Sequence, residues 1–169
     1  MLSQLASLAR IDFRPRPGQP RVFRLVVATM AAIAGSLAAD ALLVVIGQAA
    51  FPSTRGYAHF QFADYGKLTV LGVIIACAGW PVVTRVSSDP RWLFARLAAV
   101  VTVALWLPDA YILYQGQPAR AVAVLFVMHL AIALVTYHLL VRVAPVGPAR
   151  DDALARPGAM APGNARGHG

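Results

Sequence analysis

The stretch VFRLVVATMAAIAGSLAADALLVVIGQ, residues 22–48, decides the fold class of this protein. Charge interrupts it only at Arg24, close to its start, and at Asp40. A helix needs about 20 mostly apolar residues to cross roughly 30 Å of hydrocarbon, and this stretch is long enough. The apolar region of a signal peptide is shorter, about 7 to 15 residues. The stretch therefore predicts a permanent membrane-spanning helix.

Three further apolar stretches of the same kind follow, at residues 67–86, 91–115 and 119–143. Residues 87–90 form a short turn in which Ser88 or Asp89 can cap the next helix, while Pro90 suits the first helical position. The composition agrees with membrane spans, because 59% of the 169 residues are hydrophobic and 13% are charged. Soluble domains are usually about 25% charged. We predict an all-α membrane protein in which residues 22–144 form a four-transmembrane-helix bundle.

The segments outside these spans have a different composition. Residues 1–21 combine a few regularly spaced apolar residues with a stretch rich in Pro and Arg, which fits either a short interfacial helix with a linker or a disordered tail. Residues 145–169 are rich in Pro, Gly and Ala and lack apolar periodicity, so we predict a disordered tail. Residues 50–66 are dense in aromatic side chains, which predicts a loop lying on the membrane surface.

The cations flank the spans very unequally. One side of the predicted bundle carries Arg10, Arg14, Arg16, Arg21, Arg24, Arg85, Arg91, Arg96, Arg142, Arg150, Arg156 and Arg166. The other side has only Arg55, Lys67 and Arg120. Because Lys and Arg are retained in cytoplasmic loops, we predict that both termini lie in the cytoplasm. The abundance of Ala, Arg, Gly and Pro suggests a GC-rich bacterial genome, and hence a bacterial plasma membrane.

The net charge of +8 also bears on partners. A nucleic-acid-binding protein would gather its cations in a stripe on a folded domain, whereas these cations flank apolar spans. We therefore expect no nucleic-acid partner. The expected partners are the lipid bilayer and either a second copy of the chain or another membrane protein.

Ionisable side chains inside the spans are the candidates for chemistry, because they are costly in hydrocarbon and usually face the interior of a bundle. At about 1.5 Å per residue, Asp40, Asp109 and His129 are expected at similar depths in the outer half of the membrane. These three residues form the predicted intramembrane polar cluster. The cluster fits two roles: carrying protons or binding cations, or tying helices together through hydrogen bonds.

Two sequence features could shape the helices around this cluster. Pro81 and Pro108 each remove a backbone hydrogen bond, so they predict either a broken helix that builds a site or a simple kink. Small residues four or three apart predict close helix packing inside the bundle. They are Ala31, Gly35 and Ala39 in the first span, and Gly72, Ala76 and Gly79 in the second.

Several kinds of chemistry are not supported by the sequence. Cys77 is the only cysteine, so a disulfide, a CxxC pair and a multi-cysteine metal site are excluded. His129 and His138 share one predicted helix and point to opposite sides of it, which excludes a haem held by histidines from two facing helices. Phosphate-binding loops, HExxH and catalytic-triad spacings are also missing. We expect no cofactor, no metal site and no catalytic residues.

With its four spans, the turn at residues 87–91 and the Met128-His129-Leu130 stretch, the chain resembles uncharacterised four-span membrane proteins of actinobacteria. The resemblance covers about residues 21–142 and implies an architecture without implying an activity. The leading hypothesis is a small non-enzymatic inner-membrane protein that acts through membrane partners or by packing in the bilayer. The alternative is an oligomeric proton-coupled transporter of small molecules that uses the Asp/His cluster, and an enzyme acting on a lipid or quinone comes third.

Overall fold

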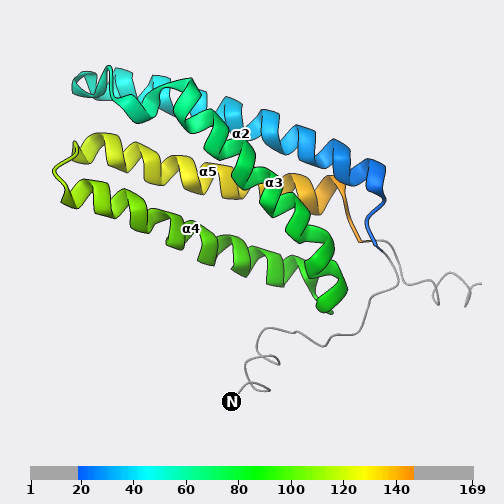
Figure 1. Ribbon diagram of the computed structural model, residues 1–169. Helices are drawn as coiled ribbons and strands as arrows, with labels where there is room; N and C mark the ends of the chain where they lie inside the picture. Colours follow the sequence, from blue (N-terminus) through cyan, green and yellow to red (C-terminus); the bar gives the residue numbers. More distant parts are fainter. Residues whose placement is uncertain (1–18, 147–169) are drawn as a thin grey trace, which may run out of the picture.

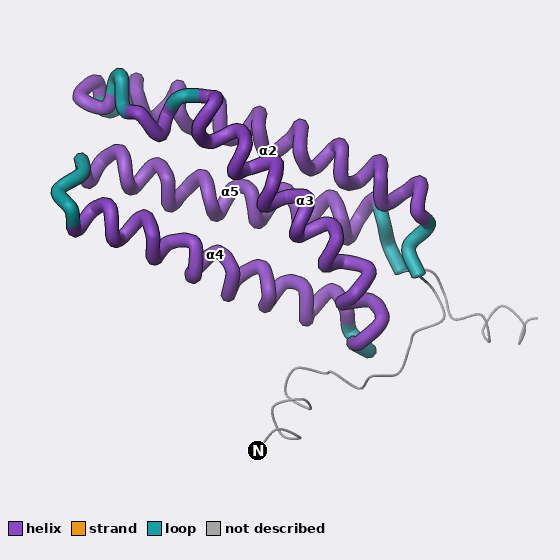
Figure 2. The backbone as a smooth tube through the Cα atoms, viewed as in Figure 1, coloured by secondary structure: helices purple, strands orange, loops and turns teal. Residues whose placement is uncertain are grey.

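The computed structural model describes residues 19–146 (Figure 1). Within that range the chain forms four long helices and no strand, as Figure 2 shows. They are α2 (Val22–Ala50), α3 (Phe62–Val86), α4 (Pro90–Tyr114) and α5 (Ala119–Val143). Each is long and apolar enough to cross a membrane, which confirms the prediction of an all-α fold with four helices of this kind. Nearly all of the predicted N-terminal segment and C-terminal tail lies outside the described residues.

The helices pack around α5 (Figure 1). The most extensive contact joins α2 to α5, and α4 and α3 also pack against α5. The start of α2, the end of α5 and the α3–α4 turn lie at one end of the bundle, which we call the terminal end. The α2–α3 loop and the α4–α5 turn lie at the other, which we call the loop end.

Local interactions explain where two of the helices begin. α3 starts at Phe62, whereas the sequence predicted Lys67. Asp64 occupies its first turn, where a negative charge is favourable, and contacts His59 Nδ1 at 2.7 Å and Lys67 Nζ at 3.3 Å. At the start of α4, the cap is Asp89, whose Oδ1 accepts a hydrogen bond from the Trp92 amide at 3.3 Å. Of the two predicted capping residues, the structure therefore selects Asp89.

Small residues bring α2 and α5 close together. The buried side of α2 consists of Ala28, Ala32, Ser36, Asp40, Val44 and Gly47. A Cβ atom at Gly47 would lie 2.8 Å from Val124 Cγ2, and one at Gly35 would lie 3.1 Å from Val135 Cγ1. Side chains of ordinary size at these two positions would separate the helices.

One prediction about α3 needs correction, and one of the two alternatives for the prolines of α3 and α4 is excluded. A Cβ atom at Gly72 or Gly79 would meet nothing within 4 Å, so these glycines do not mediate close packing within the described structure. Pro81 and Pro108 lie inside uninterrupted helices, so neither helix is broken. Pro108 is exposed, and the carbonyl of Pro81 accepts a hydrogen bond from Thr84 Oγ1 at 2.8 Å.

The α2–α3 loop folds over the loop end of the bundle. It contains two short 3₁₀ turns, η1 (Pro52–Thr54) and η2 (Ala58–Phe60). Thr54 and Phe60 are buried, although Phe62 remains 63% exposed. Most other side chains of the loop are exposed or partly exposed, so its placement on the membrane surface stays a prediction, with Phe60 packed into the bundle beneath it.

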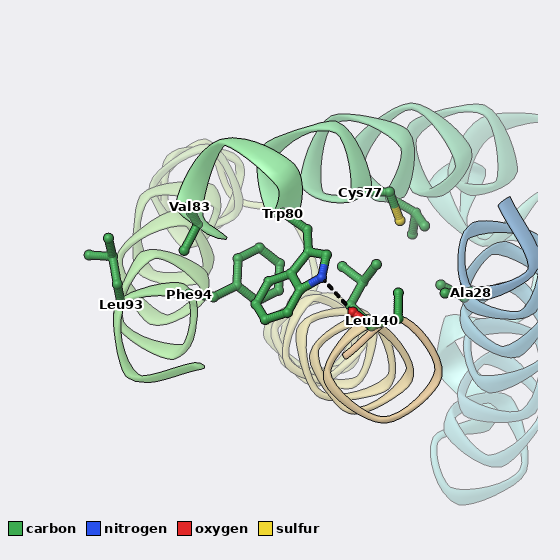
Figure 3. Close-up of a cluster of buried hydrophobic side chains, with 10 residues drawn as sticks. Ala28, Cys77, Trp80, Val83, Leu93, Phe94 and Leu140 are labelled. Atoms are coloured by element: carbon green, nitrogen blue, oxygen red, sulfur yellow. Dashed lines mark hydrogen bonds between the residues drawn. The ribbon is translucent and has the colours of Figure 1, made fainter. Parts of the chain in front are cut away.

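The described part of the chain contains two separate apolar cores. The terminal-end core consists of Ala28, Ala32, Val73, Cys77, Trp80, Val83, Leu93, Phe94, Leu140 and Ala144 (Figure 3). Its centre is Trp80, whose Nε1 donates a hydrogen bond to the Ala144 carbonyl at 2.9 Å and whose ring meets Phe94 edge-on. The loop-end core consists of Val44, Phe60, Ala121, Val124, Leu125 and Met128.

Candidate functional site: a buried polar layer

A polar layer separates the two apolar cores. Along α2, Ala32 belongs to the terminal-end core, Ser36 and Asp40 follow, and Val44 belongs to the loop-end core. The order on α5 is reversed because this helix runs in the opposite direction: Met128 lies in the loop-end core, His129 and Thr136 follow, and Leu140 lies in the terminal-end core. The polar layer consists of Ser36, Asp40, Thr69, Thr102, Asp109, His129 and Thr136.

Asp40 is the most enclosed ionisable residue of the layer. Its exposed fraction is 0%, and its Oδ2 accepts a hydrogen bond from Thr69 Oγ1 at 2.7 Å. This bond joins α2 to α3 in the interior of the bundle. Its other carboxyl oxygen, Oδ1, has no hydrogen-bond partner among residues 19–146.

Asp109 and His129 form the second pair and join α4 to α5. His129 Nδ1 lies 3.0 Å from Asp109 Oδ2 and also 3.0 Å from the Leu125 carbonyl oxygen. Because a carbonyl oxygen can only accept a hydrogen bond, Nδ1 carries the proton and donates a hydrogen bond to the Leu125 carbonyl. Asp109 Oδ2 is thus held at ion-pair distance but receives no aligned hydrogen bond. The His129 side chain is 26% exposed and that of Asp109 is 10% exposed.

The two pairs are close enough to influence each other. Asp40 interacts electrostatically with His129, so the three residues singled out in the sequence lie in one region of the bundle. His138 does not join them, because it is exposed and its Nδ1 lies 2.8 Å from the Leu134 carbonyl. Cys77 lies in the terminal-end core.

Tyr57 in the α2–α3 loop adds a group that the sequence had indicated only as an interfacial aromatic residue. Its hydroxyl is buried and finds no hydrogen-bond partner in the part of the chain that the structure describes. Burial raises the pKa of Tyr57, and the negative charge of Asp109 adds to the effect. The loop therefore places a phenol within electrostatic range of the polar layer.

Thr69 was not predicted as part of the site either. A threonine within an apolar span is unremarkable in sequence, since its hydroxyl usually bonds to its own helix. Thr102 does so, donating to the Ala98 carbonyl at 2.8 Å. Only the packing of α3 against α2 directs Thr69 to Asp40.

Within residues 19–146, no Lys or Arg side chain neutralises the carboxyls of the layer. Every Lys and Arg side chain of residues 19–146 is exposed, so none enters the layer. Its ionisable groups are two carboxyls and one imidazole. Within the same residues, no three His, Cys, Asp or Glu side chains are close enough to hold a metal ion together. The arrangement can exchange hydrogen bonds and protons, and it offers no nucleophile–base pair of the kind that hydrolases use.

No protein-family model matches the chain, and neither a curated protein nor a solved structure is significantly similar to it. The resemblance to actinobacterial four-span proteins stays a prediction.

Proposed function

We propose that this chain is a non-enzymatic multi-pass membrane protein that acts within the bilayer, through a membrane partner or by packing, and whose polar layer ties its four helices together. The observation that carries this proposal is the enclosure of the layer between two apolar cores. The terminal-end core, with Trp80 at its centre, separates Asp40 from the terminal end of the bundle. A substrate of ordinary size has no polar path to Asp40 through that core.

The pairs in the layer support such a structural role. Asp40–Thr69 links α2 to α3, and Asp109–His129 links α4 to α5. Interhelical polar contacts of this kind contribute about 0.6 to 2 kcal/mol each in a membrane. Each of the four helices supplies one partner, and the extensive α2–α5 contact connects the two pairs.

The proposed location is a bacterial plasma membrane, with the terminal end of the bundle in the cytoplasm. Among the described residues, the terminal end carries Arg21, Arg24, Arg85, Arg91, Arg96 and Arg142, and the loop end carries Arg55, Lys67 and Arg120. The positive-inside rule favours the richer side as cytoplasmic. Arg96 also stacks on Trp92, with its guanidinium carbon 3.9 Å from the ring centroid, which suits an anchor at the membrane interface.

A second candidate function is proton-coupled transport by an oligomer. Within residues 19–146, five buried polar atoms without hydrogen-bond partners favour it: Ser36 Oγ, Asp40 Oδ1, Tyr57 Oη, Asp109 Oδ2 and Thr136 Oγ1. Polar groups with a purely structural role are usually hydrogen-bonded when buried, so these unsatisfied oxygens favour groups that exchange protons. Four helices enclose little room for a substrate, which is why this candidate requires several copies.

The two candidates are distinguished by proton flux. The purified chain would be reconstituted into liposomes with an internal pH dye, and the wild type compared with Asp40→Asn and Asp109→Asn under an imposed pH gradient. The proposal predicts no flux above that of empty liposomes. Flux that disappears in both variants but persists in Asp64→Asn, a partly exposed carboxyl at the loop end, would establish transport and overturn the proposal.

A further inference from the structure

An open apolar groove runs between α2 and α5 near the loop end of the bundle. Its lining residues lie within 43–51 at the end of α2 and within 123–127 at the start of α5, and all of them are apolar. Its volume of about 210 Å³ is far larger than the roughly 30 Å³ that one molecule of liquid water occupies. The groove therefore has room for several carbons of a hydrocarbon chain.

The groove is open toward the outside of the bundle, where lipid would lie. Gly47 and Val124 are buried and form its floor, which is deep because Gly47 has no side chain. Ile46 and Val127 form its rims and are 52% and 48% exposed. A lipid chain can therefore enter the groove from the side without displacing any helix.

A cation stands at the loop-end mouth of the groove. Arg120 lies three residues before Ala123 and four before Val124, so it extends the lining face of α5 by one turn. Its guanidinium carbon lies 5.5 Å from the centroid of the Phe51 ring, and Phe51 itself lines the groove. The charge and the apolar groove thus belong to one continuous surface.

This cation is available to a ligand. Arg120 is exposed and makes no salt bridge within residues 19–146. Lys67, another cation of the loop end, is by contrast paired with Asp64 at 3.3 Å. The charge of Arg120 is therefore not neutralised by a neighbouring carboxylate of the described chain.

The order of the charge and the groove along α5 matches the order of the parts of a phospholipid. Arg120 is the second residue of the helix and lies at its loop-end terminus, where lipid headgroups begin. Residues 123–127 lie about 5 to 10 Å deeper, at 1.5 Å per residue. A phosphate beside Arg120 would therefore place the first part of its acyl chain at the level of the groove.

We propose that this groove and Arg120 form a binding site for one anionic diacyl phospholipid, with one acyl chain in the groove and the phosphate on Arg120. A guanidinium presents its N–H donors in a plane that fits phosphate oxygens two at a time. Other lipid chains are equally apolar, so preference for this position comes from dispersion contacts in the preformed groove together with the charge. The bound lipid covers the α2–α5 contact at Gly47 and Val124.

The lipid site goes beyond the proposed function and does not depend on it. It requires that the bundle stands in a bilayer, whether the protein then acts through a partner or moves protons. It is also independent of the orientation, because the phosphate lies at whichever membrane surface the loop end faces. Its residues are separate from the polar layer, so variants of the site leave Asp40, Asp109 and His129 unchanged.

The test is native mass spectrometry of the full chain, released from detergent micelles that contain equal amounts of phosphatidylglycerol and phosphatidylcholine with the same acyl chains. The wild type should retain one phosphatidylglycerol in preference to phosphatidylcholine. Arg120→Gln should weaken its binding about tenfold, because the charged donor is lost. Ala123→Leu should also weaken it, because the larger side chain fills the groove. Ala123 is exposed, so this change leaves the packing of the helices intact.

Two matched controls separate this site from general contact with lipid. Arg55→Gln removes another exposed cation of the loop end, and Ala110→Leu enlarges an exposed alanine that lies as far from the loop-end terminus of α4 as Ala123 lies from that of α5. Both should retain phosphatidylglycerol as the wild type does. Glycerol phosphate, which has the charge without the chains, should not compete.

Several results would overturn the proposal. They are equal retention of the two lipids, unchanged retention in Arg120→Gln and Ala123→Leu, and an equal loss of retention in the two controls. Competition by glycerol phosphate at the concentration of the lipid would also overturn it, because the groove would then contribute nothing. Ala50→Leu fills the groove from the α2 side and serves as the test if Ala123→Leu does not fold.

Discussion

Gly47 of α2 lies so close to Val124 of α5 that a Cβ atom at position 47 would stand 2.8 Å from Val124 Cγ2. Valine is stiff about its Cα–Cβ bond, so it cannot easily turn away. The contact fixes how near α2 and α5 come at the loop end. The same two helices carry Asp40 and His129, so the spacing of the polar layer depends on this contact.

Gly47→Ala should therefore destabilise the bundle, by about 1 to 3 kcal/mol, even though alanine favours helix formation. The measurement is the apparent Tm of the purified protein in detergent. Gly72→Ala is the matched control, because a Cβ atom there meets nothing within 4 Å. It should be neutral or stabilising by up to about 1 kcal/mol. Rescue of Gly47→Ala by Val124→Ala would confirm the steric cause, and a fall in Tm as large in Gly72→Ala would contradict it.

Replacing Asp40 should separate its hydrogen bond from its charge. Asp40→Leu leaves Thr69 Oγ1 without its acceptor in the interior and should lower the free energy of unfolding by about 1 to 3 kcal/mol. Asp40→Asn keeps an acceptor for Thr69 and should cost less than about 1 kcal/mol. Unfolding in increasing SDS would measure both. A loss in Asp40→Asn equal to that in Asp40→Leu would show that the negative charge, rather than the hydrogen bond, holds α2 to α3.

Phe60 should act as an anchor that holds the α2–α3 loop on the bundle. It is 5% exposed and lies in the loop-end core, with its ring edge-on to Tyr57 at 5.2 Å between centroids. Phe60→Ala should lower stability by about 3 kcal/mol because it leaves a cavity. Phe62→Ala, at a position 63% exposed, should change the apparent Tm little. Similar losses in the two variants would mean that the loop does not pack inward.

The orientation predicted from the cations is accessible to cysteine labelling, because Cys77 is the only native cysteine and is buried. In a Cys77→Ala background, Ser53→Cys at the exposed loop end should react with a membrane-impermeant maleimide added to whole cells. Gln19→Cys, exposed beside the start of α2, should react only after the cells are permeabilised. Labelling of both positions in intact cells would refute the cytoplasmic placement of the terminal end.

Taken by itself, the sequence determined the helical class and the identity of the ionisable residues inside the spans. Length and hydropathy suffice for the helices, because a run of apolar residues long enough to cross a bilayer has few alternatives in hydrocarbon. Asp40, Asp109 and His129 stand out for the same reason, since an ionisable group in such a run is rare. The cap at the start of α4 could be narrowed to Ser88 or Asp89, because capping depends only on neighbours in the chain.

The tertiary structure alone decided which partners these residues have. The Asp40–Thr69 hydrogen bond and the burial of Phe60 and the Tyr57 hydroxyl depend on how whole helices pack, and no local pattern encodes that packing. The small residues of the first span illustrate this. Gly35 meets Val135 of α5 as close packing requires, but the fully buried positions are Ala32, Ser36 and Asp40, each one residue beyond the predicted Ala31, Gly35 and Ala39. Rotating a helix about its own axis by one residue position changes the energy of its backbone little. It nevertheless replaces every side chain that faces the interior of the bundle. The choice between these faces is made by contacts such as Gly47 with Val124, which join residues far apart in the chain.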